Sequence, residues 1–240
     1  MDEGSLALVT GAAHRLGRIF ALTLAQHGYA IVLHYHHSDE ATASTADEIR
    51  AMGVQVYPME ADLADAEQIQ ALFSKVDSLA LPLKVLVNSA STMKHADLGN
   101  VSIEDWEAAL ALNLRAPFLL AQMAAKRMTQ GSLIVNITDA GVEKNWTGFP
   151  AYIVSKSGLE TLTRLQAKTY APKIRVNAIA PGLVLPSSET SLEEWEKLVS
   201  RLPLKRPTST DDIAKALDFL ISNQSITGQT IYVDGGYSLT

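Results

Sequence analysis

Cysteine is absent from all 240 residues of this chain. Its absence excludes both a disulfide framework and a metal site built from thiolates. Basic residues are also scarce relative to acidic ones, because 20 lysines and arginines face 26 aspartates and glutamates, for a net charge of −6. Non-specific binding of nucleic acid requires a basic surface, and the sequence has no basic recognition helix. We therefore expect no nucleic-acid partner.

A long hydrophobic run is missing as well. No apolar stretch approaches the roughly 20 residues that a helix needs to span a bilayer. The acidic start Met1–Ser5 lacks the features of a signal peptide. Linkers and low-complexity segments are also absent. We expect one domain over residues 1–240, located in the cytoplasm and without a membrane partner.

Short apolar runs alternate with helical patterns along the chain. The runs are continuous in apolar residues, which is typical of buried strands in a parallel sheet. They cover Leu6–Thr10, Ala30–Tyr35, Val54–Met59, Val85–Ala90, Ser132–Thr138, Arg175–Ala180 and Gln229–Val233. The helical patterns fall at residues 15–27, 39–52, 65–78, 102–128, 151–170 and 210–222, and Pro117 should kink or divide the fourth. This alternation predicts an α/β fold: a single-domain, Rossmann-like, doubly wound parallel sheet of about seven strands with helices on both faces.

One long irregular region, from Pro181 to about Pro207, contains four of the nine prolines. A loop of this length in a compact domain is usually functional. We expect a substrate lid over about residues 183–207, with Leu183 and Leu185 as apolar walls and Trp195 within the closing segment.

The segment from Thr10 to Gly17 follows the first strand and opens the first helix. Glycines at such a turn let the backbone approach a pyrophosphate, which then lies at the helix N-terminus. Arg15 places a guanidinium where an anion would bind. Two glycines in this position would, alternatively, only shape the loop. We predict a dinucleotide phosphate site that comprises Gly11, His14, Arg15, Leu16 and Gly17.

The end of the second strand indicates which dinucleotide binds. An NAD site usually has an acidic residue there, whereas NADP requires donors for a phosphate. The run Leu33–Ser38 has no acid at its tip, and its His36, His37 and Ser38 suit a phosphate. A metal site or a merely polar loop are the alternatives, but a metal site lacks companion ligands nearby. The sequence favours NADPH and no metal.

Tyr152 and Lys156 form a Y-x-x-x-K pair, so on a helix the ammonium lies beside the phenol. A phenol with a pKa of about 10 is a poor proton shuttle, and a neighbouring cation should lower that pKa. Asp139 lies upstream, at the end of an apolar run. The pair alone arises by chance in many helices, so its meaning depends on the other motifs.

Over essentially its whole length, the chain resembles the short-chain dehydrogenase/reductases. The matching pieces are Thr10-Gly11 with Gly17, Asp62-Leu63, Asn88-Ser89-Ala90, Asn113, Tyr152 with Lys156, Pro181-Gly182, Thr227-Gly228 and Val233-Asp234-Gly235-Gly236. The resemblance implies a water-bridged proton relay at Asn113, adenine binding at Asp62, and binding of the nicotinamide ribose by Lys156, which also tunes Tyr152. It also implies cofactor contacts from Leu63, Asn88, Ala90, Ser91, Pro181 and Gly182.

Three departures from the common family pattern are similar to the pteridine reductase branch: Arg15, the run His34–Ser38, and Asp139 in place of a serine. That branch uses NADPH to reduce dihydropterins and dihydrofolate. Met93 occupies the place where those enzymes have an aromatic residue, and methionine packs on a ring less rigidly. Family members are commonly tetramers joined through the helices near 102–128 and 151–170, so we expect a homotetramer.

Asp139 suits the reduction of a C=N bond. A serine hydroxyl suffices for a ketone, whereas the basic nitrogen of an imine benefits from a nearby acid whose pKa is raised by burial. Asp139 would, alternatively, be a solvated carboxylate or accept helix N–H bonds. The predicted catalytic residues are Asp139, Tyr152, Lys156 and Asn113, and the predicted contacts of a pterin or folate are Arg15, Ser91, Met93, Asp139, Tyr152, Leu183 and Leu185.

Two other functions remain open. One is a carbonyl reductase of a 3-oxoacyl thioester, steroid or sugar ketone, which shares the fold, cofactor and Tyr152–Lys156 pair but favours serine at position 139. The other is a non-catalytic NADPH-binding regulator in which Asp139 has spoiled the site.

Overall fold

Seven parallel strands form a single sheet in the computed structural model, which describes residues 4–187 and 190–240. The strands are β1 (Leu6–Val9), β2 (Ala30–Tyr35), β3 (Val56–Glu60), β4 (Leu83–Asn88), β5 (Ser132–Ile137), β6 (Ile174–Pro181) and β7 (Thr230–Val233). Their order is β3-β2-β1-β4-β5-β6-β7, and every neighbouring pair is parallel. The predicted α/β fold is confirmed.

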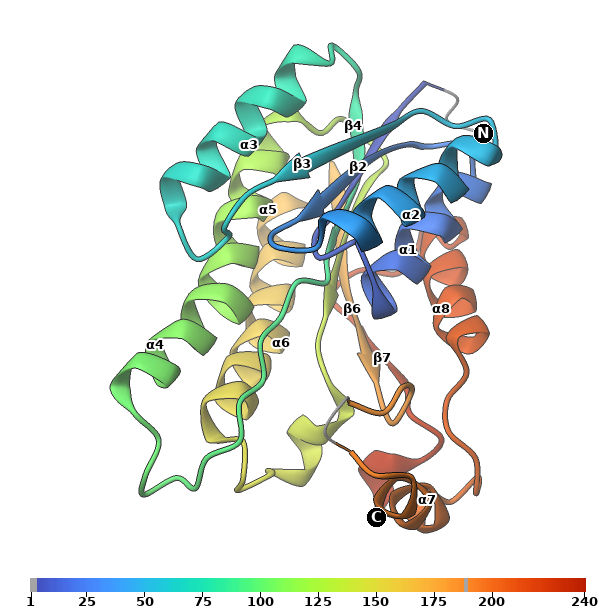
Figure 1. The fold of residues 1–240 in the computed structure, drawn as a ribbon. Coiled ribbons are helices and arrows are strands. Elements are labelled where there is room, and N and C mark those ends of the chain that lie inside the picture. Colours follow the sequence, from blue (N-terminus) through green and yellow to red (C-terminus); the bar gives the residue numbers. More distant parts are fainter. Residues whose placement is uncertain (1–3, 188–189) are drawn as a thin grey trace.

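Helices cover both faces of the sheet (Figure 1). They are α1 (Arg15–Gln26), α2 (Asp39–Ala51), α3 (Ala66–Ser78), α4 (Ile103–Leu110), α5 (Ala116–Arg127), α6 (Pro150–Tyr170), α7 (Leu192–Arg201) and α8 (Thr210–Ser222). A π-helical turn, η1 (Ala111–Arg115), joins α4 to α5, and two short 3-10 helices are η2 (Ala140–Lys144) and η3 (Tyr237–Leu239).

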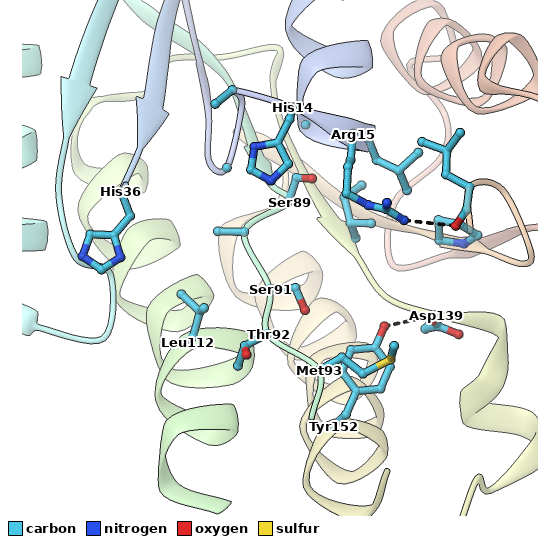
Figure 2. A pocket seen from close by; sticks show the side chains of 18 of the residues that line it. His14, Arg15, His36, Ser89, Ser91, Thr92, Met93, Leu112, Asp139 and Tyr152 are labelled. Atoms are coloured by element: carbon cyan, nitrogen blue, oxygen red, sulfur yellow. Dashed lines mark hydrogen bonds between the residues drawn. The ribbon is translucent and has the colours of Figure 1, made fainter. Parts of the chain in front are cut away.

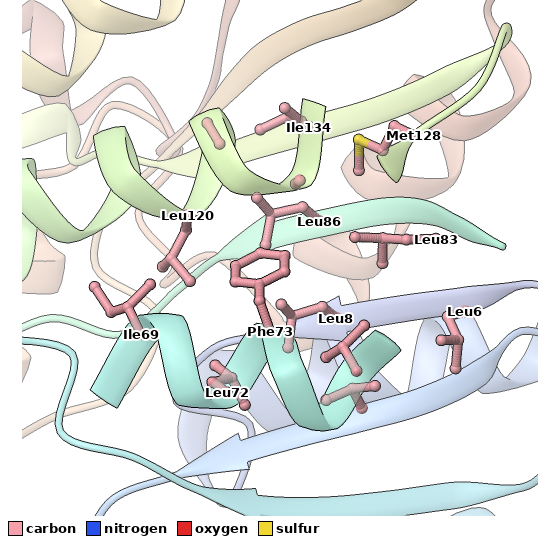
Figure 3. Close-up of a cluster of buried hydrophobic side chains, with 14 of the residues drawn as sticks. Leu6, Leu8, Ile69, Leu72, Phe73, Leu83, Leu86, Leu120, Met128 and Ile134 are labelled. Atoms are coloured by element: carbon pink, nitrogen blue, oxygen red, sulfur yellow. The ribbon is translucent and has the colours of Figure 1, made fainter. Parts of the chain in front are cut away.

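The core consists of two apolar layers, one on each side of the sheet. On one side, α1, α2 and α8 pack on the strands through residues such as Phe20, Ile49 and Leu217. On the other, Figure 3 shows Phe73 of α3 near Leu86 of β4, within the cluster that also contains residues of α5. The central strands are buried on both faces, so their continuous apolar sequence has a direct physical cause.

The helical stretch Ile103–Arg127 is continuous but divided, as Pro117 predicted. Pro117 lies in the first turn of α5, where its missing N–H is tolerated, and η1 directly precedes it. By length and composition alone this stretch would suffice to cross a membrane, contrary to the expectation from the sequence. Here Leu120, Ala121 and Ala124 of α5 pack in the core of the sheet, as in a core helix.

The region expected to be irregular contains a helix. Ser191 and Glu194 form a capping box that begins α7, and this S-x-x-E signal was present in the sequence between the four prolines. The predicted lid of residues 183–207 is therefore partly helical. Two of its residues, Ser188 and Glu189, lie outside the described part of the chain.

The strand order locates the site. From β1 the chain proceeds to β2 and β3 on one side and then returns to β4 on the other. At such a reversal the loops after neighbouring strands diverge and leave a crevice at the carboxyl ends of the strands. The loops after β1 and β4 begin at Thr10 and Ser89, and Ser89 N–H donates to Thr10 Oγ1 at 2.9 Å.

Candidate active site

A cavity of about 630 Å³ opens at the carboxyl ends of the strands. It collects most of the predicted site residues, although they come from distant parts of the sequence. Those that line it are Gly11, His14, Arg15, Leu16, Gly17, His36, His37, Ser38, Asp62, Leu63, Ala90, Ser91, Met93, Asp139, Tyr152, Lys156, Pro181, Gly182, Leu183 and Leu185. Asn88 and Asn113 are the predicted residues that do not line it.

The turn between β1 and α1 is built on two glycines. Gly11 has a φ of +62°, which favours glycine. A Cβ on Gly17 would lie 2.0 Å from the carbonyl oxygen of Gly11, so the first turn of α1 packs directly on the loop backbone. This close packing brings the N-terminus of α1 to the cavity wall, as the sequence predicted.

His34 stabilises this turn through hydrogen bonds of both ring nitrogens. Its Nδ1 accepts a hydrogen bond from Gly11 N–H at 3.1 Å, and its Nε2 lies 2.9 Å from the carbonyl oxygen of Ala61, to which it donates. Burial lowers its pKa to about 4, so the imidazole is neutral. His34 therefore differs from His36 and His37, the histidines predicted to bind phosphate, although it lies in the same run of sequence.

His36 and His37 are exposed at the tip of β2, and their rings stack with centroids 3.5 Å apart. Ser38 follows as the N-cap of α2, and Asp39 lies in the first turn of that helix, beyond the tip as expected. The tip thus presents two imidazoles, a hydroxyl and a helix N-terminus to the cavity.

Arg15 connects the turn to the lid. Its guanidinium donates to the carbonyl oxygens of Leu185 and Pro186, each at 3.0 Å, and a dashed line in Figure 2 marks one of these bonds. Its φ of +51° lies in the left-handed region that favours glycine. The sequence predicted an anion contact here, whereas the guanidinium of this structure binds lid carbonyls.

Asp139 and Tyr152, two of the predicted catalytic residues, are in direct contact (Figure 2). The phenol of Tyr152 donates to Asp139 Oδ2 at 2.6 Å, and Gly141 N–H donates to Asp139 Oδ1 at 2.7 Å. Asp139 therefore does two things: it begins η2 as its N-cap, which was one alternative from the sequence, and it contacts the tyrosine. The two roles use different oxygens and are compatible.

The pKa values of this pair are both raised. Burial raises the pKa of Asp139, while the bonds from Tyr152 and Gly141 and the charge of Lys156 oppose the rise. Burial, and then the carboxylate of Asp139, raise the pKa of Tyr152 well above its ordinary value. The predicted lowering of the tyrosine pKa by Lys156 is wrong for this structure, because burial and the neighbouring carboxylate dominate. The phenol stays protonated and is a donor.

Lys156 lies one helical turn from Tyr152 on α6, as predicted. Its Nζ donates to the carbonyl oxygen of Ile137 at 2.7 Å and lies 5.6 Å from the centroid of the Tyr152 ring. Burial lowers the pKa of Lys156 to about 8, and Asp139 opposes this shift. The ammonium is thus fixed at the end of β5, beside the phenol.

Asn113 is fully buried in η1, behind the cavity wall. Its side-chain oxygen accepts from Ser91 Oγ at 3.0 Å and Thr92 N–H at 2.8 Å, and its amide donates to Thr92 O and Ser155 Oγ. The side chain therefore positions the loop after β4. Asn88 is likewise buried and donates to Asn136 Oδ1 at 2.8 Å, which couples β4 to β5.

Several lining residues were not predicted: Ala13, Tyr35, Ala61, Ser89, Thr92, Leu112, Ile137, Thr138, Trp146 and Val184. Most follow directly from neighbours that were predicted. Trp146 does not, because it enters from the loop after η2, and only its proximity to Asp139 in the sequence could have indicated it. Within residues 4–187 and 190–240, no group of three or more His, Asp or Glu side chains converges in a metal-binding arrangement.

Comparisons with known proteins agree with this geometry. Residues 11–238 match the family described as enoyl-(acyl carrier protein) reductase. The chain is 34% identical over 237 residues to the 3-oxoacyl-[acyl-carrier-protein] reductase FabG of Staphylococcus aureus, covering 96% of each chain.

Two solved structures are similar in fold. FolM alternative dihydrofolate reductase 1 from Brucella canis, complexed with NADP, superposes with a TM-score of 0.94 at 35% identity, covering 100% of this chain and 96% of that one. The angucycline C-6 ketoreductase LanV with bound NADP gives 0.92 at 28% identity, covering 99% and 97%.

Proposed function

The chain belongs to the short-chain dehydrogenase/reductase family, and from that premise we propose that it reduces the C=N bond of a dihydropterin or dihydrofolate. It is an oxidoreductase whose cofactor is NADP(H). The similarity to FolM supports a folate or pterin substrate, and the chemistry of position 139 supports it independently.

The turn after β1 fits a dinucleotide. The positive φ of Gly11 and the absence of a side chain at Gly17 leave bare backbone at the N-terminus of α1, where a pyrophosphate would accept N–H bonds. His14, Arg15 and Leu16 border the same space. When bound, NADPH supplies the hydride, from C4 of its nicotinamide.

We infer the remaining cofactor contacts from the predicted residues that line the cavity. We assign the 2′-phosphate to His36, His37 and Ser38, and the adenine to Asp62 and Leu63. The nicotinamide half would meet the residues at the ends of β4 and β6, namely Ala90, Ser91, Pro181 and Gly182. Lys156 would bind the nicotinamide ribose. Asn88 supports this wall through the sheet rather than by contact.

The protein's own residues hold the proton. Asp139 accepts a hydrogen bond from the phenol of Tyr152 in this structure, and burial raises the pKa of its carboxyl; a proton taken up there would be delivered to the substrate nitrogen directly or through that phenol. A water-bridged relay would use the backbone carbonyl of Asn113. The amide side chain of Asn113 is already bonded to Thr92, which is why the proposal places the relay at the backbone.

A single observation carries the choice of substrate: the 2.6 Å contact between Tyr152 Oη and Asp139 Oδ2 in a buried site. A ketone becomes an alkoxide and needs one donor, which tyrosine provides. A C=N nitrogen is basic, and an adjacent acid favours arrival of hydride at the neighbouring carbon. Arg15, Ser91, Met93, Leu183 and Leu185 would border this substrate.

A carbonyl reductase is the second candidate. The 34% identity to FabG and the similarity to LanV favour it, as does Met93 in place of an aromatic residue. The pair Tyr152–Lys156 serves either reaction. What distinguishes them is whether the carboxyl of Asp139 promotes or hinders turnover.

The test measures NADPH oxidation with dihydrobiopterin, dihydrofolate and a 3-oxoacyl thioester, for the wild type and Asp139→Ser. We expect the wild type to reduce a pterin or folate, and the variant to lose about 10²–10⁴-fold in kcat/KM with unchanged NADPH affinity. Equal pterin turnover by both proteins would remove Asp139 from the mechanism. Turnover of the thioester alone would identify a carbonyl reductase, and tight NADPH binding without any turnover would identify a regulator.

We also propose a homotetramer in the cytoplasm. An apolar groove runs along α4, α5 and α6, and Phe118, Val154 and Leu165 are exposed beside or within it. A second copy of the chain would bury this surface. Light scattering after size exclusion should give four chains, and Phe118→Glu with Leu165→Glu should give a smaller assembly.

A further inference from the structure

The substrate end of the cavity has no aromatic residue at position 93. Met93 lies on the loop after β4, and 48% of its surface is exposed. A flexible thioether gives a flat ring an adaptable contact but no fixed plane. If the substrate is a planar bicycle, another element has to provide that plane.

Trp146 lines the same cavity as Met93, Asp139 and Tyr152. It follows η2 and precedes α6, so it lies on the short connection between the catalytic aspartate and the catalytic tyrosine. Among the described residues, the other tryptophan of the cavity is Trp195 on α7, in the lid.

The indole of Trp146 is held on several sides. A Cβ on Gly141 would lie 2.7–2.8 Å from three of its ring atoms, so the indole packs directly on that glycine. The rings of Phe149 and Tyr237 meet it edge to face, each with a centroid distance of 5.9 Å. A side chain fixed in this way loses little conformational freedom when a ligand binds.

The same packing connects Trp146 to the proton donor. Gly141, on which the indole lies, donates its N–H to Asp139 Oδ1 at 2.7 Å. The indole of Trp146 and the carboxyl of Asp139 therefore both contact Gly141, so a ligand that packs on the indole would lie close to Asp139. Ala140 and Leu202 are buried in a small apolar cluster against which Trp146 and Leu183 pack.

We propose that Trp146 is the fixed aromatic wall of the substrate site and selects a planar heteroaromatic ring over an acyl chain. This inference deepens the proposed pterin or folate reduction and rests on it. A pterin ring gains stacking energy against an indole, whereas an acyl chain gains only the burial of apolar surface. Met93 then adapts to the ring from another part of the cavity.

The test separates substrate binding from turnover. We compare Trp146→Ala and Trp146→Phe using dihydrobiopterin and a 3-oxoacyl thioester. Trp106→Ala is the matched control, because Trp106 lies on α4 and outside the cavity. We expect Trp146→Ala to raise the KM for dihydrobiopterin about tenfold or more, with little change in kcat or NADPH affinity. Trp146→Phe should retain most of the wild-type KM, and the thioester KM should change little.

A second measurement leaves Trp146 in place. The double variant Trp106→Phe/Trp195→Phe retains Trp146 as the single tryptophan of the chain. With NADPH bound, saturating methotrexate, a pteridine that is not reduced, should quench its emission. Trp146→Leu keeps an apolar side chain and takes over the kinetic comparison if the alanine variant loses NADPH affinity.

The outcomes distinguish the two proposals. A wild type that turns over no pterin or folate overturns both. A wild type that does so, with an unchanged dihydrobiopterin KM in Trp146→Ala and no quenching of Trp146, overturns the aromatic wall alone. A larger rise in KM from Trp195→Ala than from Trp146→Ala would assign the wall to the lid instead and would also overturn the inference.

Discussion

The phenol oxygen of Tyr152 lies 2.6 Å from Asp139 Oδ2, and both groups have raised pKa values because they are buried together. The pair therefore keeps its protons to higher pH than either group would in water. In the proposed reaction this arrangement would supply a proton as negative charge or basicity develops on the substrate.

The pH profile should reveal this acid. If protonated Asp139 delivers the proton, wild-type kcat/KM for dihydropterin falls as pH rises through the raised pKa of that carboxyl. Asp139→Ser should be slower and should lack this decline. Initial rates between pH 5 and pH 9 measure both profiles, and an identical decline in the two proteins would assign it to another group.

Lys156 should make the free energy of unfolding depend on pH in the alkaline range. Its folded pKa of about 8 lies below its ordinary value, so between about pH 8 and 10 the unfolded chain binds a proton that the folded chain does not. Stability from this group therefore rises with pH across that window. Relative to Lys156→Met, the wild-type free energy of unfolding should increase by on the order of 2 kcal/mol from pH 8 to pH 10. Urea unfolding at the two pH values measures this increase, and parallel changes in the two proteins would contradict the lowered pKa of Lys156. Turnover should be lost in the variant at both pH values.

The tip of β2 should set the cofactor preference. His37→Asp places a carboxylate where the 2′-phosphate would bind. This carboxylate would repel the phosphate of NADPH and would accept a hydrogen bond from the 2′-hydroxyl of NADH. We expect the ratio of kcat/KM for NADPH over NADH to fall by about tenfold or more, about 1.4 kcal/mol. His95→Asp makes the same change in charge outside the cavity and should leave the ratio unaltered. An unchanged ratio in His37→Asp would move the phosphate site elsewhere.

Arg15 should couple cofactor binding to the lid. Arg15→Gly removes both bonds to the Leu185 and Pro186 carbonyls while suiting the positive φ at that position. Faster amide hydrogen exchange in the described lid residues near Leu185 is expected, together with NADPH affinity weakened about tenfold. Arg18 cannot serve as the control position, because its side chain is ion-paired with Glu48 of α2. Arg164→Gln, on the exposed surface of α6, serves as the control. Unchanged exchange and affinity would make the contact incidental.

Much of the fold was predictable because its signals are local and repeated. Most strands are predominantly apolar runs. The helical spacing of Tyr152 and Lys156 sets their proximity without further information. The capping box at Ser191 is also a local signal, but the surrounding prolines favoured an irregular loop, so α7 was not predicted.

The parts that could not be predicted depend on contacts between distant segments. Whether His34 faces a phosphate or Gly11 depends on how β2 packs against the turn after β1. The direction of the Tyr152 pKa shift depends on how deeply the phenol is buried, not on the spacing to Lys156. The position of Trp146 depends on the rings of Phe149 and Tyr237, the second of which is near the C-terminus.

His34 should make the stability of the fold decrease at acidic pH. Both ring nitrogens are occupied only while the imidazole is neutral, since protonation of Nδ1 would oppose the N–H of Gly11. Between about pH 4 and 6.5, His34 binds a proton in the unfolded chain but not in the folded chain. The free energy of unfolding therefore decreases as the pH falls through this range. Acidification should therefore weaken the turn proposed to bind the cofactor, because His34 supports that turn through its bond with Gly11.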